Sequence, residues 1–158
     1  MIKYIVGFLV VAISTVAGKK FTEKYKCRYD FFKALSAFNS EVIRDMAYKK
    51  DGLLSVMKKS YGNDSFDEYL KKVAKSAEEG TELPEPPEFL EREDGGYVKK
   101  YFSQIGRFSS AAETDLLLSA REELNARTEE HKSKSDKFAA LGAKLGFAVG
   151  MTVFIIII

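Results

Sequence analysis

The chain of 158 residues has one cysteine, one histidine and no tryptophan, and these scarcities narrow the chemistry open to it. Because Cys27 has no second cysteine to pair with, an internal disulfide is impossible, which favours a reducing compartment for the middle of the chain. The single histidine, His131, lies in a very polar stretch, where we interpret it as a solvated surface residue. No set of histidines, cysteines and carboxylates has the spacing of metal ligands.

Phosphate loops and nucleophile motifs are missing too. Gly95-Gly96 followed by Lys99 and Lys100 lacks the P-loop spacing. Ser109-Ser110 is better explained as a helix cap than as a nucleophile. The sequence therefore predicts no catalytic, cofactor-binding or metal-binding residue, and we expect a protein that is not an enzyme. The formal net charge of +2 gives no basis for nucleic-acid binding.

Strand signals are also lacking, because no alternating run of valine, isoleucine and threonine is bounded by hairpin turns. Apolar residues instead recur every three or four positions, as in amphipathic helices. The sequence therefore predicts an all-α fold, a helical bundle.

Long apolar runs are confined to the two ends of the chain. Residues 1–18 and 138–158 carry almost no charge, whereas residues 19–137 are highly charged. A helix needs about 20 apolar residues to cross a bilayer, and the second run has that length while the first is at the short limit. We expect a transmembrane helix at 1–18, an all-helical domain at 19–137 and a transmembrane helix at 138–158.

The first run also fits a signal peptide, with Thr15-Val16-Ala17 as a passable cleavage signal. Cleavage would give a secreted protein anchored by its tail. Lys19 and Lys20 follow at once, and a helical pattern begins a few residues later, which favours retention as an anchor.

Basic residues flank both runs on their inner sides. These are Lys19, Lys20, Lys24, Lys26, Arg28, Lys132, Lys134 and Lys137. Such residues are held on the cytoplasmic side, so the domain is expected to be cytoplasmic. Lys144, inside the second run, can extend its stem back to the interface. Alternatively, Lys144 marks the membrane boundary.

Three glycines at intervals of four, Gly142, Gly146 and Gly150, lie on one face of the last helix. Such a face lets a second backbone approach closely in a membrane, so we expect it to pack against another helix. The partner is the first run, a second copy of the chain in a homo-oligomer, or another membrane protein. Alternatively, the glycines only reflect their frequency in membrane helices.

Helical periodicity divides the middle into segments. The predicted helices are 25–46, ended by Asp51-Gly52; 53–59; 66–77, capped at Ser65; 88–92, stopped by Gly95-Gly96; 97–105; and 111–158. The last helix is long and enters the membrane, and its charged part is expected to hold the pairs Glu123–Arg127 and Glu130–Lys134. Residues 78–94 are acidic and proline-rich, and we interpret them as a solvated loop or, alternatively, a docking site.

The C-terminal third resembles the stage III sporulation protein AB family. The similar features are Ile105-Gly106 with Ser109-Ser110, then Leu116-Leu117-Leu118 and Glu122-Glu123-Leu124, the charged stretch 127–137, and the tail from Leu141-Gly142 to four isoleucines. Near the start, residues 37–42 are similar to another segment of the family. The resemblance covers about half of the chain, and residues 49–96 do not align convincingly.

The resemblance implies a role in endospore formation. The family's domain is similar to the cytoplasmic domains of the platform proteins of type II secretion and type IV pilus machines. The protein would then sit in the mother-cell membrane around the forespore, help to assemble a channel complex with other sporulation proteins, and dock a secretion-type ATPase. A membrane-bound regulator or enzyme with an unrecognised site is the other alternative.

Overall fold

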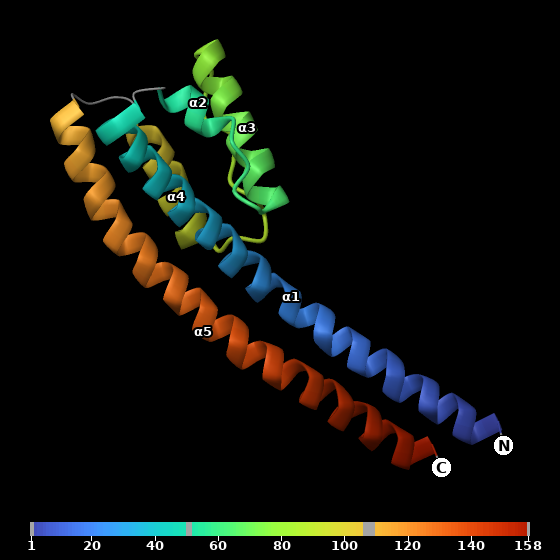
Figure 1. Ribbon diagram of the computed structural model, residues 1–158. Helices are drawn as coiled ribbons and strands as arrows, with labels where there is room; N and C mark the ends of the chain where they lie inside the picture. The colour runs from blue at the N-terminus through green and yellow to red at the C-terminus, as the bar shows by residue number, and fades with distance from the viewer. Residues whose placement is uncertain (1, 50–51, 106–109, 158) are drawn as a thin grey trace. The chain divides into compact units, whose positions relative to one another are not determined.

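A computed structural model describes residues 2–49, 52–105 and 110–157, and these form helices joined by turns, with no strand among them (Figure 1). The elements are α1 Ile2–Arg44, the π-helix η1 Asp45–Lys49, α2 Leu53–Met57, α3 Asp64–Glu79, α4 Arg92–Gln104 and α5 Ser110–Ile157. The predicted all-α fold is confirmed. The predicted long last helix is also confirmed, since α5 continues to Ile157, and α1 joins the first apolar run to the helix predicted at 25–46 without a break.

The chain divides into two compact units. One, here called the two-helix unit, contains Met1–Tyr29 and Glu130–Ile158; the other, the core unit, contains Asp30–Glu129. The long helices α1 and α5 each contribute residues to both units.

An aromatic cluster forms the centre of the core unit. Phe31, Phe32, Phe38 and Phe66 are fully buried. The ring of Phe38 contacts four others, those of Tyr61, Phe66, Tyr101 and Phe102, at centroid distances of 5.5, 6.1, 6.5 and 5.7 Å. Full burial of one such side chain stabilises the fold by roughly 1.5–3 kcal/mol, so these rings hold α1, α3 and α4 together.

The short helix α3 begins and ends with defined caps. The side chain of Asn63 accepts a hydrogen bond from the Phe66 amide at 2.8 Å, so the predicted cap at Ser65 is wrong by two residues. Gly80 ends the helix with φ 66°, a left-handed conformation that glycine adopts at little cost. Phe66, Leu70 and Val73 lie on one face of α3 and are buried.

Helix α4 contradicts two predictions. It begins at Arg92 and passes through Gly95-Gly96, which therefore do not stop a helix, and residues 88–90 form a turn rather than a short helix. Each internal glycine costs about 1 kcal/mol relative to alanine. Burial of Val98, Tyr101 and Phe102 on one side of α4 outweighs that cost. Ile105, directly after α4, is buried as well.

The end of α1 departs from the α-helical pattern and widens into a π-helix. The α-helix stops at Arg44 and continues as the π-helix η1, with Asp45 5% exposed. Its carboxylate accepts a hydrogen bond from the Gly52 amide at 3.2 Å, and Gly52 has φ 88°. Asp51, predicted to end this helix, lies outside the described residues, as do Gly106 and Ser109 of the family-like segment.

Among the described residues, no helix combines enough length with enough apolar character to span a bilayer. The transmembrane helices expected at 1–18 and 138–158 therefore gain no support from the fold. Several apolar side chains of both segments lie outside what the structure describes.

Candidate functional site

The two-helix unit is held together by direct backbone contact between α1 and α5. A Cβ atom added to Gly18 would meet the Gly142 carbonyl oxygen and lie 3.2 Å from the Gly146 Cα atom. One added to Gly150 would lie 2.8 Å from the Val11 Cα atom. The structure thus brings all three glycines of the predicted face against the first apolar run, where only residues without a side chain allow so close an approach.

Apolar side chains of this unit are distributed inside out. Gly146 and Gly150 are buried between the helices. Large apolar side chains point away from the contact: Leu9, Ile13, Val16, Leu141, Leu145, Phe147, Val149 and Ile155 are between 48% and 70% exposed. This order is the reverse of a water-exposed helix pair, which buries its large apolar side chains and exposes small or polar ones.

Basic and aromatic residues follow the apolar part. Lys20, Lys137 and Lys144 are exposed, and the side chain of Lys19 lies outside the described part of the chain. The rings of Tyr25 and Phe138 are stacked, with centroids 4.1 Å apart. The Lys24 Nζ atom and the Arg28 guanidinium carbon lie 5.1 and 5.7 Å from the Tyr25 centroid. Such contacts between cations and rings contribute about 0.5–1 kcal/mol where they are exposed.

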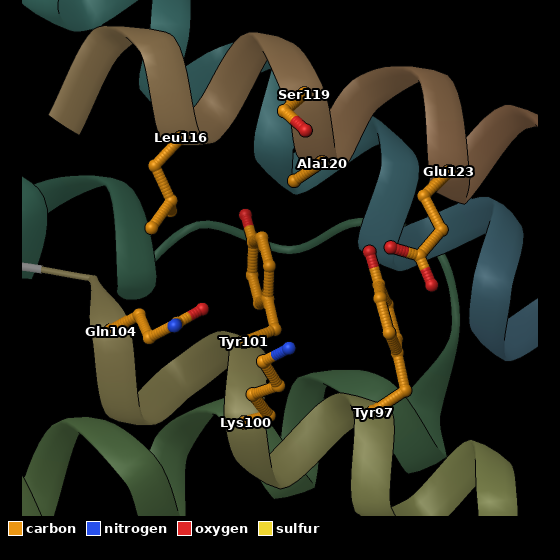
Figure 2. A pocket seen from close by; sticks show the side chains of 8 residues that line it. All are labelled: Tyr97, Lys100, Tyr101, Gln104, Leu116, Ser119, Ala120 and Glu123. Atoms are coloured by element: carbon orange, nitrogen blue, oxygen red, sulfur yellow. The ribbon is translucent and has the colours of Figure 1, made fainter. Parts of the chain in front are cut away.

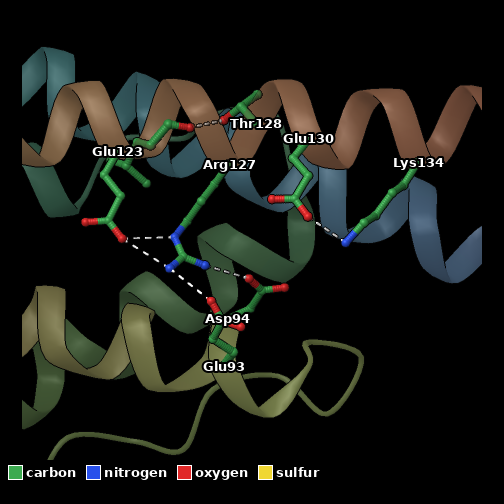
Figure 3. Close-up of polar contacts among 8 residues, drawn as sticks. Glu93, Asp94, Glu123, Arg127, Thr128, Glu130 and Lys134 are labelled. Carbon is green, nitrogen blue, oxygen red and sulfur yellow. Dashed lines mark hydrogen bonds and ion pairs between the residues drawn. The ribbon is translucent and has the colours of Figure 1, made fainter.

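His131 is 5% exposed, so its interpretation as a solvated surface residue is wrong. It follows Leu117 and Leu124, both fully buried, at intervals of seven residues, and it therefore lies on the same face of α5. The seven-residue spacing was the signal in the sequence, although the residues around His131 are polar. The predicted pair Glu130–Lys134 is confirmed at 2.7 Å (Figure 3).

Arg127 on α5 is the centre of a cluster of charges in the core unit (Figure 3). Its guanidinium lies 3.1 Å from Asp94, 3.4 Å from Glu93 and 3.1 Å from Glu123, which confirms the predicted pair with Glu123. Burial opposes its charge, but these carboxylates raise the pKa of Arg127 above its ordinary value. The guanidinium also lies 4.5 Å from the centroid of the Tyr97 ring, so Arg127 fastens α5 to α4.

A small cavity of about 250 Å³ lies beside this cluster, between α4 and α5 (Figure 2). Its lining residues are Tyr97, Lys100, Tyr101, Gln104, Leu116, Ser119, Ala120 and Glu123. The rings of Tyr97 and Tyr101 point from α4 toward α5 (Figure 2). Burial raises the pKa of Tyr97 to about 12, with Glu123 adding to the shift, so its hydroxyl is neutral near pH 7.

Asn39 on α1 connects three helices. The Tyr101 hydroxyl donates to its side-chain oxygen at 2.8 Å, and its amide nitrogen donates to the Leu117 carbonyl at 3.1 Å. All of these residues are buried, so the polar groups are satisfied without water. Asn39 and Tyr101 are therefore engaged in holding α1, α4 and α5 together.

Part of the acidic segment 78–94 has internal partners. Glu78 lies 3.2 Å from Lys58, Glu85 lies 2.5 Å from Lys99, and Asp94 contacts Arg127. Whether this segment docks a partner stays a prediction. Among residues 2–49, 52–105 and 110–157, no group of three or more histidines, cysteines and acidic residues is arranged to hold a metal ion.

A comparison with protein families finds that the family described as stage III sporulation protein AB matches residues 3–158. A comparison with curated proteins finds no match, and a comparison with solved structures also finds none. The expected likeness to secretion platform domains therefore stays a prediction. The family match includes residues 49–96, which could not be aligned convincingly from the motifs alone. It covers nearly the whole sequence, so the chain belongs to the stage III sporulation protein AB family and is a sporulation protein.

Proposed function

We propose that the protein is a non-enzymatic, membrane-anchored assembly component of the sporulation machinery. The two-helix unit holds it in the mother-cell membrane around the forespore, and the core unit lies on the cytoplasmic side. There the core unit binds other components of a channel complex, including a secretion-type ATPase. The family supports the sporulation role, and the following observations support the rest.

The observation that carries the proposal is the inside-out two-helix unit. Ile13, Leu145 and Ile155 are 63%, 61% and 70% exposed, while the helices touch through glycines. Each large apolar side chain left in water forgoes roughly 1.5–3 kcal/mol that burial would provide. Contact with lipid removes that cost, and packing through small residues is how helices associate in lipid. Large exposed apolar surfaces on a protein otherwise mark interaction sites.

The flanking charges support the orientation. Exposed Lys20 lies just after the first apolar run and exposed Lys137 just before the second, and basic residues are retained on the cytoplasmic side. A homo-oligomer, if it forms, must use another surface than the face with Gly142 and Gly150, because that face is occupied by α1 of the same chain.

A non-enzymatic role is supported by what the polar groups of the core unit do. The cavity between α4 and α5, at about 250 Å³, is smaller than the ~300–1,000 Å³ of typical ligand pockets, whereas the more open hollow lined by Gly80, Lys99 and Ser103 has about 690 Å³. Of the groups that line the smaller cavity, Tyr101 is hydrogen-bonded to Asn39 and Glu123 is paired with Arg127. These contacts fix helices to one another, as in a scaffold.

Carbonate extraction of membranes from sporulating cells tests the anchor. We expect the wild-type protein in the pellet, and we expect a variant with Ile13→Glu and Leu145→Glu in the supernatant. Leu54→Glu is the matched control, because Leu54 is 41% exposed but lies on α2 in the core unit. Full-length wild-type protein in the supernatant would falsify the membrane proposal.

Protease added to intact cells tests the secreted alternative, because a core unit inside the cell is out of its reach. A cytoplasmic core unit stays intact, whereas digestion would support the secreted alternative. That alternative also predicts a mature N-terminus after residue 17 or 18, which mass spectrometry detects.

Crosslinking from Glu85 or Glu123 in sporulating cells identifies the partner. Recovery of an ATPase subunit supports the docking role, and recovery of no channel component contradicts it.

A further inference from the structure

Contacts along the two-helix unit fix which residues of α1 and α5 lie at the same level. Val11 meets Gly150, Gly18 meets Gly142, and Tyr25 stacks on Phe138. The residue number rises on α1 as it falls on α5, so the two segments are antiparallel. At about 1.5 Å per residue, residues 20–28 of α1 therefore lie beside residues 134–142 of α5.

Basic residues are concentrated at this level. Residues 19–29 and 130–137, here called the collar, contain eight basic and three acidic residues, a net charge of +5. The core unit, residues 30–129, contains 15 basic and 20 acidic residues, a net charge of −5. The total charge of +2 hides this separation. An anionic surface would attract the collar and repel the core unit.

We infer that the collar binds the headgroups of anionic phospholipids and so sets the depth at which the two-helix unit sits; this inference rests on the proposed membrane role. The apolar side chains that lie below the collar would enter the hydrocarbon. Lys20, Lys26, Lys132 and Lys137 are exposed at the collar itself. A polybasic segment beside the membrane recognises anionic lipid in this way.

Two further features place the headgroups at this level. The stacked pair Tyr25–Phe138 lies among the basic residues of the collar, at the end of the apolar part, and aromatic residues occupy such a level at membrane interfaces. Lys144 lies two residues beyond Gly142 toward the apolar end, about 3 Å, so its stem reaches the level of Lys20. Cations from both helices thus converge on one layer of phosphates.

Local lipid composition can be measured with a single fluorophore, since the natural chain has no tryptophan. Leu141→Trp places one at an exposed position, three residues beyond Phe138. The full-length protein is reconstituted into vesicles of equal amounts of phosphatidylcholine and phosphatidylglycerol, with bromine on the acyl chains of one lipid or the other. The ratio of quenching by the two brominated lipids then reports which lipid surrounds the collar.

We expect quenching by phosphatidylglycerol to exceed quenching by phosphatidylcholine several-fold. Each lysine neutralised should lower that preference by up to about 5-fold, the factor for ~1 kcal/mol per basic residue near an anionic surface. Lys20→Gln, Lys26→Gln and Lys137→Gln together should bring the ratio close to one. The variant with arginine at the same three positions keeps the charges and should keep the preference for phosphatidylglycerol. The matched control replaces Lys58, Lys71 and Lys100 of the core unit with glutamine.

Each outcome has one meaning. Equal quenching by both lipids in the natural collar overturns the inference and leaves the membrane role standing. No quenching by either lipid overturns the membrane role itself. Loss of the preference on adding glycerol phosphate would show a site for free phosphate and overturn the lipid assignment. A preference unchanged between about 0.1 M and 1 M salt, where the screening length falls from ~10 to ~3 Å, also contradicts it.

Discussion

The hydroxyl of Tyr101 on α4 donates a hydrogen bond to the side chain of Asn39 on α1, at 2.8 Å and out of contact with solvent. Through its amide, Asn39 also binds the Leu117 carbonyl of α5 at 3.1 Å. One side chain therefore ties three helices that are distant in sequence. A buried polar group that loses its hydrogen-bond partner lowers the free energy of unfolding by about 1–3 kcal/mol, so stability is sensitive to substitution of Asn39.

Asn39→Ala should lower the free energy of unfolding by about 2–4 kcal/mol, because it leaves the Tyr101 hydroxyl and the Leu117 carbonyl unpaired. Tyr101→Phe removes only one of these bonds and should cost about 0.5–1.5 kcal/mol. Thermal unfolding of the full-length protein in detergent, followed by circular dichroism, measures both. Strict additivity in the double variant would contradict the shared bond, because coupled residues deviate from it.

Arg127→Lys should destabilise the core unit by about 1–3 kcal/mol although the charge is kept. A lysine cannot contact Asp94, Glu93 and Glu123 together with the Tyr97 ring, because it lacks the planar fork of arginine. Arg121→Lys, at an exposed position of α5, is the control and should change stability by less than about 0.5 kcal/mol. Equal losses of stability in the two variants would contradict the role assigned to Arg127.

Gly142→Ala should separate the helices of the two-helix unit. Its Cβ atom would collide with the Thr22 methyl group and lie 2.8 Å from the Gly18 carbonyl oxygen, and the backbone oxygen cannot move aside alone. Thermal unfolding of the full-length protein in detergent, followed by circular dichroism, measures the loss of packing. Gly96→Ala is the control, since nothing lies within 4 Å of its added Cβ, and it should stabilise α4 by about 0.5–1 kcal/mol.

Glu41 should make stability depend on pH in the acid range. The hydrogen bond from Lys59, at 2.7 Å, and that from Arg44 lower the pKa of Glu41 from 4.5 to about 2. Its stabilising contribution is present above pH 4.5, where the unfolded chain is also ionised, and it is lost as the pH falls toward 2. The stability difference between the wild type and Glu41→Gln should therefore shrink between these values. A difference that is constant from neutral pH down to 2 would contradict this coupling.

Helix type and extent were largely predictable from local patterns. Apolar residues at intervals of three or four predicted helices, and the four-residue spacing of Gly142, Gly146 and Gly150 indicated one helix face. The errors came where a local rule competed with packing. Gly95-Gly96 should end a helix by propensity, yet burial of the neighbouring face carries α4 through them.

The polar core could not be predicted in the same way. Asn39 is an ordinary helical residue in the sequence, and its partners Tyr101 and Leu117 are 62 and 78 positions away. His131 lies among charged residues, and only its spacing from Leu124 placed it on the buried face. Pairing of residues so distant depends on how the helices are brought together.

The sequence by itself determined the family, the all-α fold and the separation of apolar ends from a charged middle, because these follow from composition, motif order and a period of 3.6 residues. Only the tertiary structure decided that Gly142 and Gly150 face α1, that Arg127 gathers three carboxylates, and that Lys20 lies near the level of Lys144. Those relationships depend on register between helices, and register is set by close packing of side chains that no local pattern records.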